Sequence, residues 1–243
     1  MRRVEVVSLI YRSVEFSRFI SDQLARFARA EGFDVRGRLI ANDPEVPAEE
    51  LLAPARAAGL RTDVYRDAKP GDYYLNRVYR CWNWAVASAA ADLVCLVNSD
   101  MAFSPGWLEP LLRLHDEGCT PTSRLVESGR LRTGRHGIEK DWGRRPAEFA
   151  EAAWLEYARD ISAPAVVEDE DLFMPVVFDK AIFAEAGGYP EGNIYRDGVG
   201  TRSGNVLQSG DAYFFDRLAD LGRPHATAFD SLVYHMQEGE MRS

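Results

Sequence analysis

Short hydrophobic runs alternate with longer, helix-periodic stretches along the first half of the chain. The runs have the length of strands and lie at residues 4–10, 34–41, 60–65 and 93–97. In the longer stretches hydrophobic residues recur every three or four positions, at residues 14–31, 47–58, 74–91 and 105–116. Strands that alternate with helices in this way predict an α/β fold with a mostly parallel central sheet flanked by helices.

The second half is less regular. It predicts strands at residues 120–127, 172–178 and 227–235, and helices at residues 146–159, 179–186 and 211–221. Residues 128–145 are rich in Gly and Arg and predict a surface loop, and the acidic run at 168–171 predicts a solvated face. Residues 189–210 predict a second loop, of a length that usually serves function. No linker interrupts the chain, so we expect one domain, residues 1–243.

Polar residues follow the uncharged run 93–97 at once, as Asn98-Ser99-Asp100. In open α/β sheets ligands bind beyond the carboxyl ends of the strands. Asp100 is therefore predicted at a ligand crevice, where a carboxylate suits a hard divalent cation shared with substrate phosphates. A plain turn before the next helix is the alternative.

Three further polar residues also lie at the ends of predicted elements: Asp43, Asp211 and His235. With right-handed crossovers all of them would lie on the same side of the sheet as Asp100. Each has a structural alternative. Asp43 suits a turn, Asp211 suits the first turn of a helix, and a single His near a chain end is often structural.

Charge and cysteine content exclude some classes of protein. The 243 residues carry 38 acids against 29 bases, a net charge of −9, which argues against a nucleic-acid partner. The three cysteines form no closely spaced pair and suit a reducing compartment. The apolar stretch at the amino terminus is too short for a signal peptide, and no run is long enough for a transmembrane segment. We expect a cytoplasmic protein, with peripheral membrane contact left open.

Six blocks in order resemble the GT-A fold glycosyltransferases, and family 2 in particular. They are VVSLIYRS at 6–13, LIANDP at 39–44, the block from NRVYR to LEPLL at 76–112, FMPVVFDKAIFAEAGGYPEGN at 173–193, SGDAYFFDRLADLG at 209–222 and VYHMQEGE at 233–240. The resemblance implies a nucleotide-sugar half at 1–116 and an acceptor half at 117–243.

The resemblance also implies roles for the residues of the metal and catalytic motifs. Asp100 matches the last acid of the family's D-x-D motif and His235 its histidine ligand, and an imidazole suits Mn²⁺ better than Mg²⁺. Asn98 replaces the first acid of that motif, so it can bond a ribose hydroxyl but supplies no charge. Ser99 lies between them, at the nucleotide. Asp211 matches the general base.

The remaining matches concern the donor nucleotide. Tyr11 and Arg12 lie in the block that contacts it, and Asp43 matches the acid that faces the base. Arg80 and Asn83 lie near the family's Arg and Asn on the helix before the D-x-D strand, with Arg77 a competitor for the place of Arg80.

The implied activity is metal-assisted transfer of a hexose, with inversion, from a UDP- or dTDP-sugar. The acceptor would be a saccharide, a lipid-linked sugar or a small molecule. Two alternatives stay open. A sugar-1-phosphate nucleotidyltransferase would carry its G-x-G-T-R run after the first strand, whereas here that run lies at 198–202. A non-catalytic nucleotide-sugar-binding domain would explain Asn98. A Rossmann dehydrogenase is disfavoured because no G-x-G-x-x-G follows the first strand.

Overall fold

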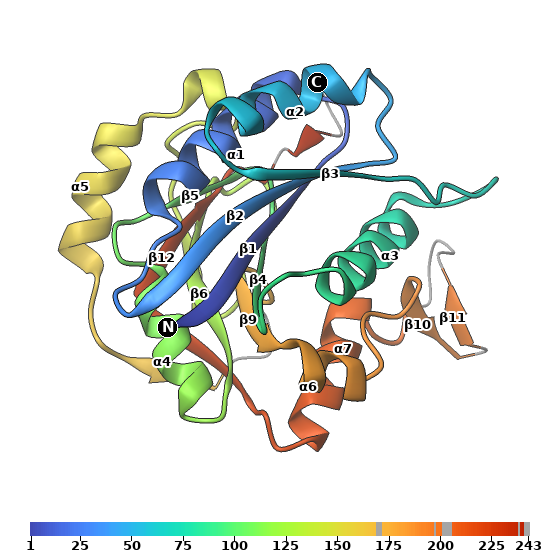
Figure 1. Ribbon diagram of the computed structural model, residues 1–243. Helices are drawn as coiled ribbons and strands as arrows, with labels where there is room; N and C mark the ends of the chain where they lie inside the picture. The colour runs from blue at the N-terminus through green and yellow to red at the C-terminus, as the bar shows by residue number, and fades with distance from the viewer. Residues whose placement is uncertain (169–171, 197, 201–205, 238, 241–243) are drawn as a thin grey trace.

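A ten-stranded sheet crosses the centre of the molecule in the computed structural model (Figure 1). The structure describes residues 1–168, 172–196, 198–200, 206–237 and 239–240. The strands are β1 (Arg2–Ile10), β2 (Phe33–Asn42), β3 (Arg61–Tyr65), β4 (Leu93–Val97), β5 (Met101–Phe103), β6 (Thr120–Glu127), β7 (Ile138–Glu139), β8 (Val166–Val167), β9 (Val176–Asp179) and β12 (His225–His235). Their order is β3-β2-β1-β4-β9-β6-β12-β5, with β7 on β6 and β8 on β12.

Most neighbouring strands of this sheet are parallel. Strands β3, β2, β1 and β4 run parallel to one another, and β12 runs parallel to β6. Strand β9 enters antiparallel between β4 and β6, and β5 pairs antiparallel with β12. The expectation of a mainly parallel sheet is confirmed.

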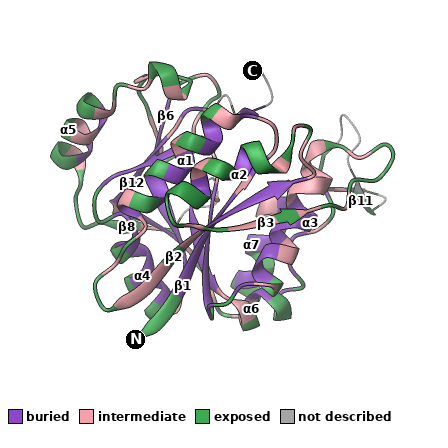
Figure 2. Cartoon of the chain, turned by 45° about the horizontal axis from the view of Figure 1, so that its top comes forward, coloured by how far each residue is buried: buried purple, intermediate pink, exposed green. Residues whose placement is uncertain are grey.

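Helices cover both faces of the sheet and enclose two hydrophobic cores. The helices are α1 (Val14–Phe27), α2 (Ala48–Ala57), α3 (Tyr74–Ala87), α4 (Leu108–Asp116), α5 (Glu151–Ile161), α6 (Lys180–Glu185), α7 (Gly210–Asp220) and a 3₁₀ turn, η1 (Pro146–Glu148). Leu93, Cys95 and Val97 of β4 point into the core under α1, α2, α4 and α5, whereas Val94 and Leu96 point into the core under α3, α6 and α7. Figure 2 shows this buried centre in purple.

Four predicted helices begin or end several residues away from their predicted bounds. The helix expected at 74–91 ends at Ala87, and the Ser88 N–H closes its last turn on the Trp84 carbonyl. The helix expected at 14–31 ends at Phe27, because the Ala28 N–H closes its last turn on Leu24 and Gly32 then adopts a left-handed φ of 81°. The helix expected from Pro105 begins at Leu108, after the unpredicted strand β5. The helix expected at 146–159 splits, because Phe149 is extended after the 3₁₀ turn that Pro146 opens.

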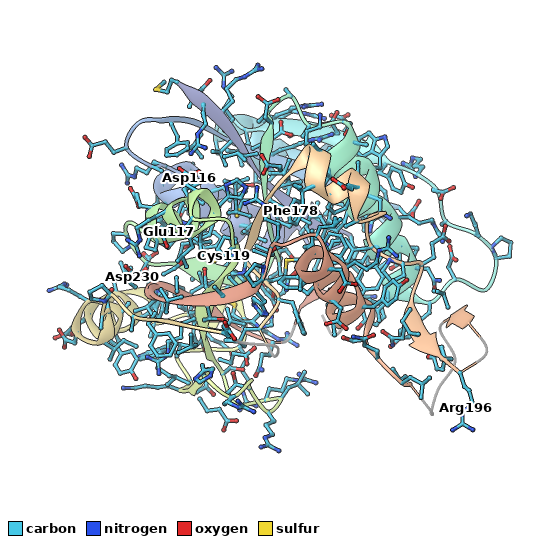
Figure 3. All side chains as sticks on the ribbon, turned by 90° about the horizontal axis from the view of Figure 1, so that it is seen from below. Asp116, Glu117, Cys119, Phe178, Arg196 and Asp230 are labelled. Atoms are coloured by element: carbon cyan, nitrogen blue, oxygen red, sulfur yellow. The ribbon has the colours of Figure 1, made fainter. Side chains whose placement is uncertain are left out.

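The segment expected to be a loop at 189–210 contains a small hairpin, β10 (Asn193–Tyr195) and β11 (Gly198–Gly200). Figure 3 shows Arg196 at this hairpin pointing away from the body of the molecule, while Phe178 of β9 lies inside it. Residues 197 and 201–205 of this segment, and residues 169–171 of the acidic run, lie outside the described residues. The functional role that the length of 189–210 suggests therefore stays a prediction.

Within the described ranges, every helix is too short or too polar to cross a membrane.

Candidate active site

Strand register brings Asp100, His235 and Glu127 together from distant parts of the sequence. In the β5–β12 pair His235 lies opposite Met101, the residue after Asp100, and the Met236 N–H donates to the Asp100 carbonyl. In the neighbouring β12–β6 pair His235 lies opposite Glu127. The three acidic and basic side chains thus meet at the ends of adjacent strands.

His235 lies between the two carboxylates. Its Nδ1 is 2.7 Å from Oε1 of Glu127, and its Nε2 is 3.4 Å from Oδ1 of Asp100. The other oxygen of Asp100 accepts from the Gly239 N–H at 3.1 Å. Burial lowers the pKa of His235, but attraction and hydrogen bonding to Asp100 and Glu127 outweigh it and raise that pKa to about 10. Burial opposes ionisation of Asp100, yet His235 holds its pKa below the usual value.

The donor set fits a divalent cation shared with a substrate. Glu127 fixes the ring of His235 through Nδ1, as a carboxylate does for many metal-binding histidines, and Nε2 then faces Asp100. A cation bound at Nε2 would replace the proton that the raised pKa of His235 retains there. A separation of 3.4 Å between Nε2 and Oδ1 is close to the roughly 3 Å between neighbouring ligands of one octahedral ion. Among the described residues no group of three or more His, Cys, Asp and Glu side chains could hold a metal ion. Substrate and water would have to supply the other ligands.

Asp211 is placed by the first turn of α7. The hydroxyl of Ser209 caps this helix by accepting from the Ala212 N–H. Gly210 lets the helix start approach α3, because a Cβ there would lie 2.6 Å from both the Gly192 carbonyl oxygen and the ring of Tyr79. The Tyr79 hydroxyl donates to Oδ2 of Asp211 at 3.1 Å.

The surroundings of Asp211 make its carboxylate more basic. Burial raises its pKa to about 6, although the hydrogen bond from Tyr79 acts in the opposite direction. The ring of Tyr79 stacks on Tyr189, with centroids 5.2 Å apart and planes 2° from parallel. This stack holds the hydroxyl that orients Asp211.

A cavity of about 540 Å³ joins these groups. Of the residues predicted from the sequence, it is lined by Tyr11, Asn98, Ser99, Asp100, Asp211 and His235. These side chains come from the β1–α1 loop, the β4–β5 turn, α7 and β12, so both halves of the chain contribute to one cavity.

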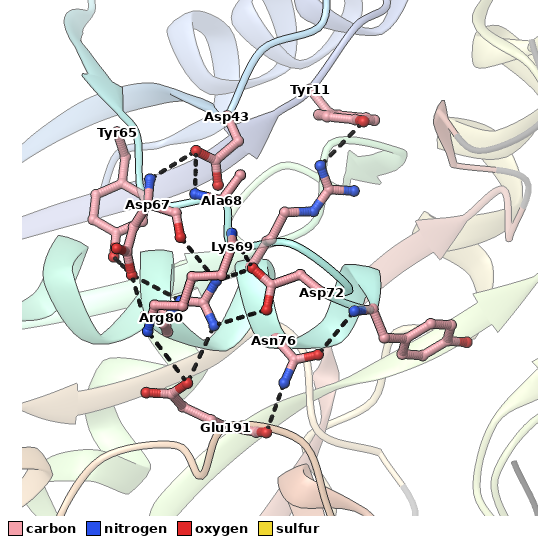
Figure 4. A network of polar contacts seen from close by, with 12 residues as sticks. Tyr11, Asp43, Tyr65, Asp67, Ala68, Lys69, Asp72, Asn76, Arg80 and Glu191 are labelled. Atoms are coloured by element: carbon pink, nitrogen blue, oxygen red, sulfur yellow. Dashed lines mark hydrogen bonds and ion pairs between the residues drawn. The ribbon is translucent and has the colours of Figure 1, made fainter. Parts of the chain in front are cut away.

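Asp43 and Arg80 do not line this cavity and belong to a polar network beside it (Figure 4). Asp43 has a left-handed φ of 44°, and its Oδ1 accepts from the N–H groups of Asp67 and Ala68 at 2.7 and 3.0 Å. Arg80 pairs with Asp72 and donates to Glu191 at 3.1 Å. Both side chains stabilise the loop before α3, and a donor-binding role for them stays a prediction.

Asn83 and Arg12 also lie away from the cavity lining. The side-chain amide of Asn83 makes two hydrogen bonds with the backbone of Tyr189. Its Nδ2 donates to the Tyr189 carbonyl and its Oδ1 accepts from the Tyr189 N–H, each at 2.9 Å. Asn83 thereby fixes the turn that presents Tyr189 to Tyr79. Arg12 donates through Nε to the Glu240 carbonyl at 2.7 Å. Their predicted contacts with the nucleotide are not tested by this arrangement.

Arg77, the competitor of Arg80, does line the cavity. Its Nη1 donates to the Tyr11 hydroxyl at 3.1 Å, and its guanidinium lies 4.6 Å from the centre of that ring. Asn42 lines the cavity as well, and its buried Oδ1 has no hydrogen-bond partner within the described chain. Asn42 is the residue before Asp43, so the end of strand β2 reaches the cavity through Asn42.

Glu240 closes one wall of the cavity and was not predicted from the sequence. Its carboxylate accepts from the N–H groups of Tyr11, Arg12 and Ser13 at 2.8, 2.6 and 2.7 Å. The end of the chain that carries His235 is therefore bound to the loop between β1 and α1. The only sequence signal is that Glu240 falls inside the last block of resemblance.

Comparison with known proteins adds support for the fold. No family model and no curated protein matches the chain. A crystal structure of Staphylococcus aureus TarS residues 1–349 resembles it with a TM-score of 0.60 at 15% identity, over 97% of this chain and 60% of that one. A second TarS structure gives 0.60 at 12% identity, over 97% of this chain and 36% of that one. The chain thus spans no more than three-fifths of these proteins. The likeness supports a GT-A-type fold and, at this identity, concerns the fold alone.

Proposed function

We propose that this protein is a glycosyltransferase that moves a sugar from a nucleotide-diphosphate sugar to an acceptor hydroxyl, with inversion. One observation carries the proposal: Asp211, an aspartate of raised pKa, lines the same cavity as the Asp100–His235 pair. Glycosyl transfer needs both parts, a base for the acceptor and a means of neutralising the leaving diphosphate. The GT-A-type fold supports the same reaction class.

Asp100 and His235 would hold Mn²⁺ or Mg²⁺, with Glu127 fixing the imidazole. A divalent ion held by these residues would neutralise the charge that develops on the leaving diphosphate. Asn98 lines the cavity beside them and can bond a ribose hydroxyl through its amide. Because Asn98 adds no negative charge, we expect weaker ion binding than two carboxylates would give.

Asp211 takes the proton of the attacking hydroxyl. A pKa of about 6 leaves the carboxylate ionised at neutral pH and more basic than an ordinary aspartate. Tyr79 orients it through the 3.1 Å hydrogen bond. With one carboxylate acting as base and no second one acting as nucleophile, direct attack inverts the configuration at the sugar carbon.

Asn42 is the best candidate to contact the nucleotide base. It lies at the end of β2, lines the cavity and carries a buried carbonyl oxygen with no partner in the described residues. Such an oxygen leaves a hydrogen bond unmade unless a ligand donates to it. The N3–H of uracil or thymine is a suitable donor, so we favour UDP- and dTDP-sugars. Tyr11, with Arg77 against its ring, lines the same cavity as Asn42.

Release of nucleoside diphosphate from a panel of UDP- and dTDP-sugars with mixed acceptors, in the presence of Mn²⁺, tests the proposal. We expect Asp211→Asn to abolish transfer and to leave donor binding nearly unchanged. Asp216→Asn, on the exposed side of the same helix, is the matched control and keeps activity. Normal turnover by Asp211→Asn would exclude Asp211 as the base. Full activity in EDTA would remove Asp100 and His235 from their roles.

A further inference from the structure

A second cavity, of about 970 Å³, adjoins the candidate active site. It is lined by Arg132, Thr133, Gly134, Arg135, Gly137 and Glu139. Arg132 and Gly134 also line the first cavity, so the two cavities share a wall. Nothing in the activity proposed above uses this second cavity.

The segment that forms it is basic in an otherwise acidic protein. Residues 129–145 contain six Arg and Lys against two acids, whereas the chain as a whole has a net charge of −9. Two arginines and one acid line the cavity itself. Glu139, the acid, accepts from the Thr133 N–H at 3.4 Å and so contributes to holding the loop. The local surplus of positive charge favours an anionic ligand.

Hydrogen bonds fix this loop beside His235. The side chain of Gln237 accepts from the Leu131 N–H and donates to the Leu131 carbonyl, both at 3.1 Å. Further along the loop, the Tyr234 hydroxyl accepts from the Trp142 N–H at 3.0 Å and donates to the Gly143 carbonyl at 2.7 Å. The loop is thus attached to the strand end that carries the metal-site histidine.

Arg132 is available to a ligand. It is exposed, and it makes no hydrogen bond or ion pair with any described residue. A guanidinium presents a planar set of donors that matches the two oxygens of a phosphate or a carboxylate. Tyr11, Asn42 and Arg77, which we assign to the nucleotide, line only the first cavity.

We propose that the second cavity is an acceptor subsite, in which Arg132 and Arg135 hold an anionic group, phosphate or carboxylate, of the acceptor. The inference rests on the proposed function, because it assigns an acceptor to that reaction. An anionic group held there lies next to the cavity that contains Asp211, so an acceptor anchored by its charge can extend a hydroxyl toward the base.

Binding to a surface that displays glucose, glucuronic acid and glucose 6-phosphate at one density tests the subsite without any donor. The two anionic sugars on the surface should retain wild-type protein more strongly than glucose does. The anionic sugar that retains more protein identifies the preferred group. Arg132→Glu should lower the retention by both anionic sugars about tenfold, the loss expected for a charge-assisted hydrogen bond. Arg132→Lys should keep part of the retention by the anionic sugars. Arg18→Glu, the same charge change on an exposed face of α1, is the matched control and should change little.

Several results would overturn the inference. One is equal retention of wild-type protein by glucose and by the anionic sugars, and another is an equal effect of Arg132→Glu and Arg18→Glu on this retention. A third is that Arg132→Glu weakens binding only to vesicles of phosphatidylglycerol, measured in parallel, and not to the sugar surface. Loss of UDP affinity by Arg132→Glu without loss of glycan retention would assign Arg132 to the donor instead. Melting of the wild type with Mn²⁺ and nucleotide sugars separates the two proposals. If no donor raises the melting temperature the proposed function fails, and if donors do so while the surface shows no charge preference only the subsite fails.

Discussion

Asp211 occupies surroundings that disfavour its own ionised form. Burial raises its pKa to about 6, and the one side-chain hydrogen bond that opposes this shift comes from Tyr79. A group whose pKa is raised on folding binds its proton more tightly in the folded state. The ionised carboxylate that the proposed reaction requires is therefore obtained at the expense of stability, as is common at active sites.

This balance predicts that Asp211→Asn stabilises the protein in a pH-dependent way. The stability that protonated Asp211 contributes is present below its ordinary pKa of 3.8 and is lost as the pH rises through about 6. We expect the free energy of unfolding of the variant to exceed that of wild type by about 1–2 kcal/mol at about pH 8 and by little at about pH 4. Thermal melting at the two pH values measures the difference. Equal melting temperatures at the higher pH would contradict the raised pKa.

Tyr79→Phe should move the acidic limb of the pH–rate profile to higher pH. The hydroxyl stabilises the ionised form of Asp211, so its removal raises the pKa of the base further. Activity at low pH then falls more than activity on the plateau. A profile recorded from about pH 5 to about pH 9 checks this. Tyr213→Phe, on the same helix as Asp211, is the control and should leave the limb in place.

The sequence predicted the candidate site residues that lie at the ends of helices and strands. Asp100, Asp211 and His235 follow or begin predicted elements, and the structure places all three on one cavity. Glu127 and Tyr79 were missed because their contacts depend on strand register and on the packing of α3 against α7. Such contacts join residues more than 100 positions apart, which no local pattern encodes.

The end of the chain acts as a structural element of the site. Glu240 accepts from three successive backbone N–H groups at the start of α1, a concave set of donors suited to a carboxylate. The contact binds the segment after β12 to the β1–α1 loop. Asp100 receives the Gly239 N–H from the same segment.

We expect Glu240→Ala to expose the N–H groups of Tyr11, Arg12 and Ser13 to solvent. Their hydrogen exchange should become at least tenfold faster, since a charge-assisted hydrogen bond is lost at each. Glu45→Ala is a matched control, because Glu45 contacts the Tyr11 hydroxyl and not these backbone N–H groups. Unchanged exchange in Glu240→Ala would mean that the closed wall does not depend on this carboxylate.

Among helices and strands, the prediction from sequence was most accurate for elements with a clear hydrophobic period. Strand β6 (Thr120–Glu127) and strand β4 (Leu93–Val97) have the predicted bounds. Strand β5 was missed because three residues are too few to show alternation, and its existence depends on pairing with β12. The first turn after Pro146 is 3₁₀ and not α, a distinction that hydrophobic spacing does not make.

A buried ion-pair network at one edge of the sheet connects strands that lie far apart in the sequence. Arg38 of β2 is fully buried and pairs with Asp63 at 2.7 Å and with Glu5 at 3.5 Å. Its guanidinium also donates to the Ala85 carbonyl of α3 at 3.1 Å. It thus connects three adjacent strands with the helix that carries Tyr79.

Removing Arg38 should destabilise the whole domain. We expect Arg38→Ala to lower the free energy of unfolding by about 3 kcal/mol, because the buried Glu5 then keeps only the partly exposed Arg61 as its charged partner. Arg36→Ala, two residues away and mostly exposed, should change it by less than about 0.5 kcal/mol. Urea unfolding of both variants makes the comparison. Similar losses for the two would show that burial of Arg38 has little weight.

The fold class followed from the sequence because the first half has a regular strand–helix alternation. Strand β9 could not be placed from the sequence, since its antiparallel entry between β4 and β6 reflects side-chain packing across the whole sheet. The same holds for the basic loop at 129–145, whose lack of periodicity gave no sign that it borders the site.

Binding of a nucleotide sugar through a divalent cation is tested most directly by thermal melting with UDP- and dTDP-sugars, with Mn²⁺ or with EDTA. We expect at least one donor to raise the melting temperature of wild type in Mn²⁺ and none to do so in EDTA. Asp100→Asn and His235→Ala should both lose the Mn²⁺-dependent shift. A full shift in EDTA, or in both variants, would contradict a metal-bound donor at Asp100 and His235.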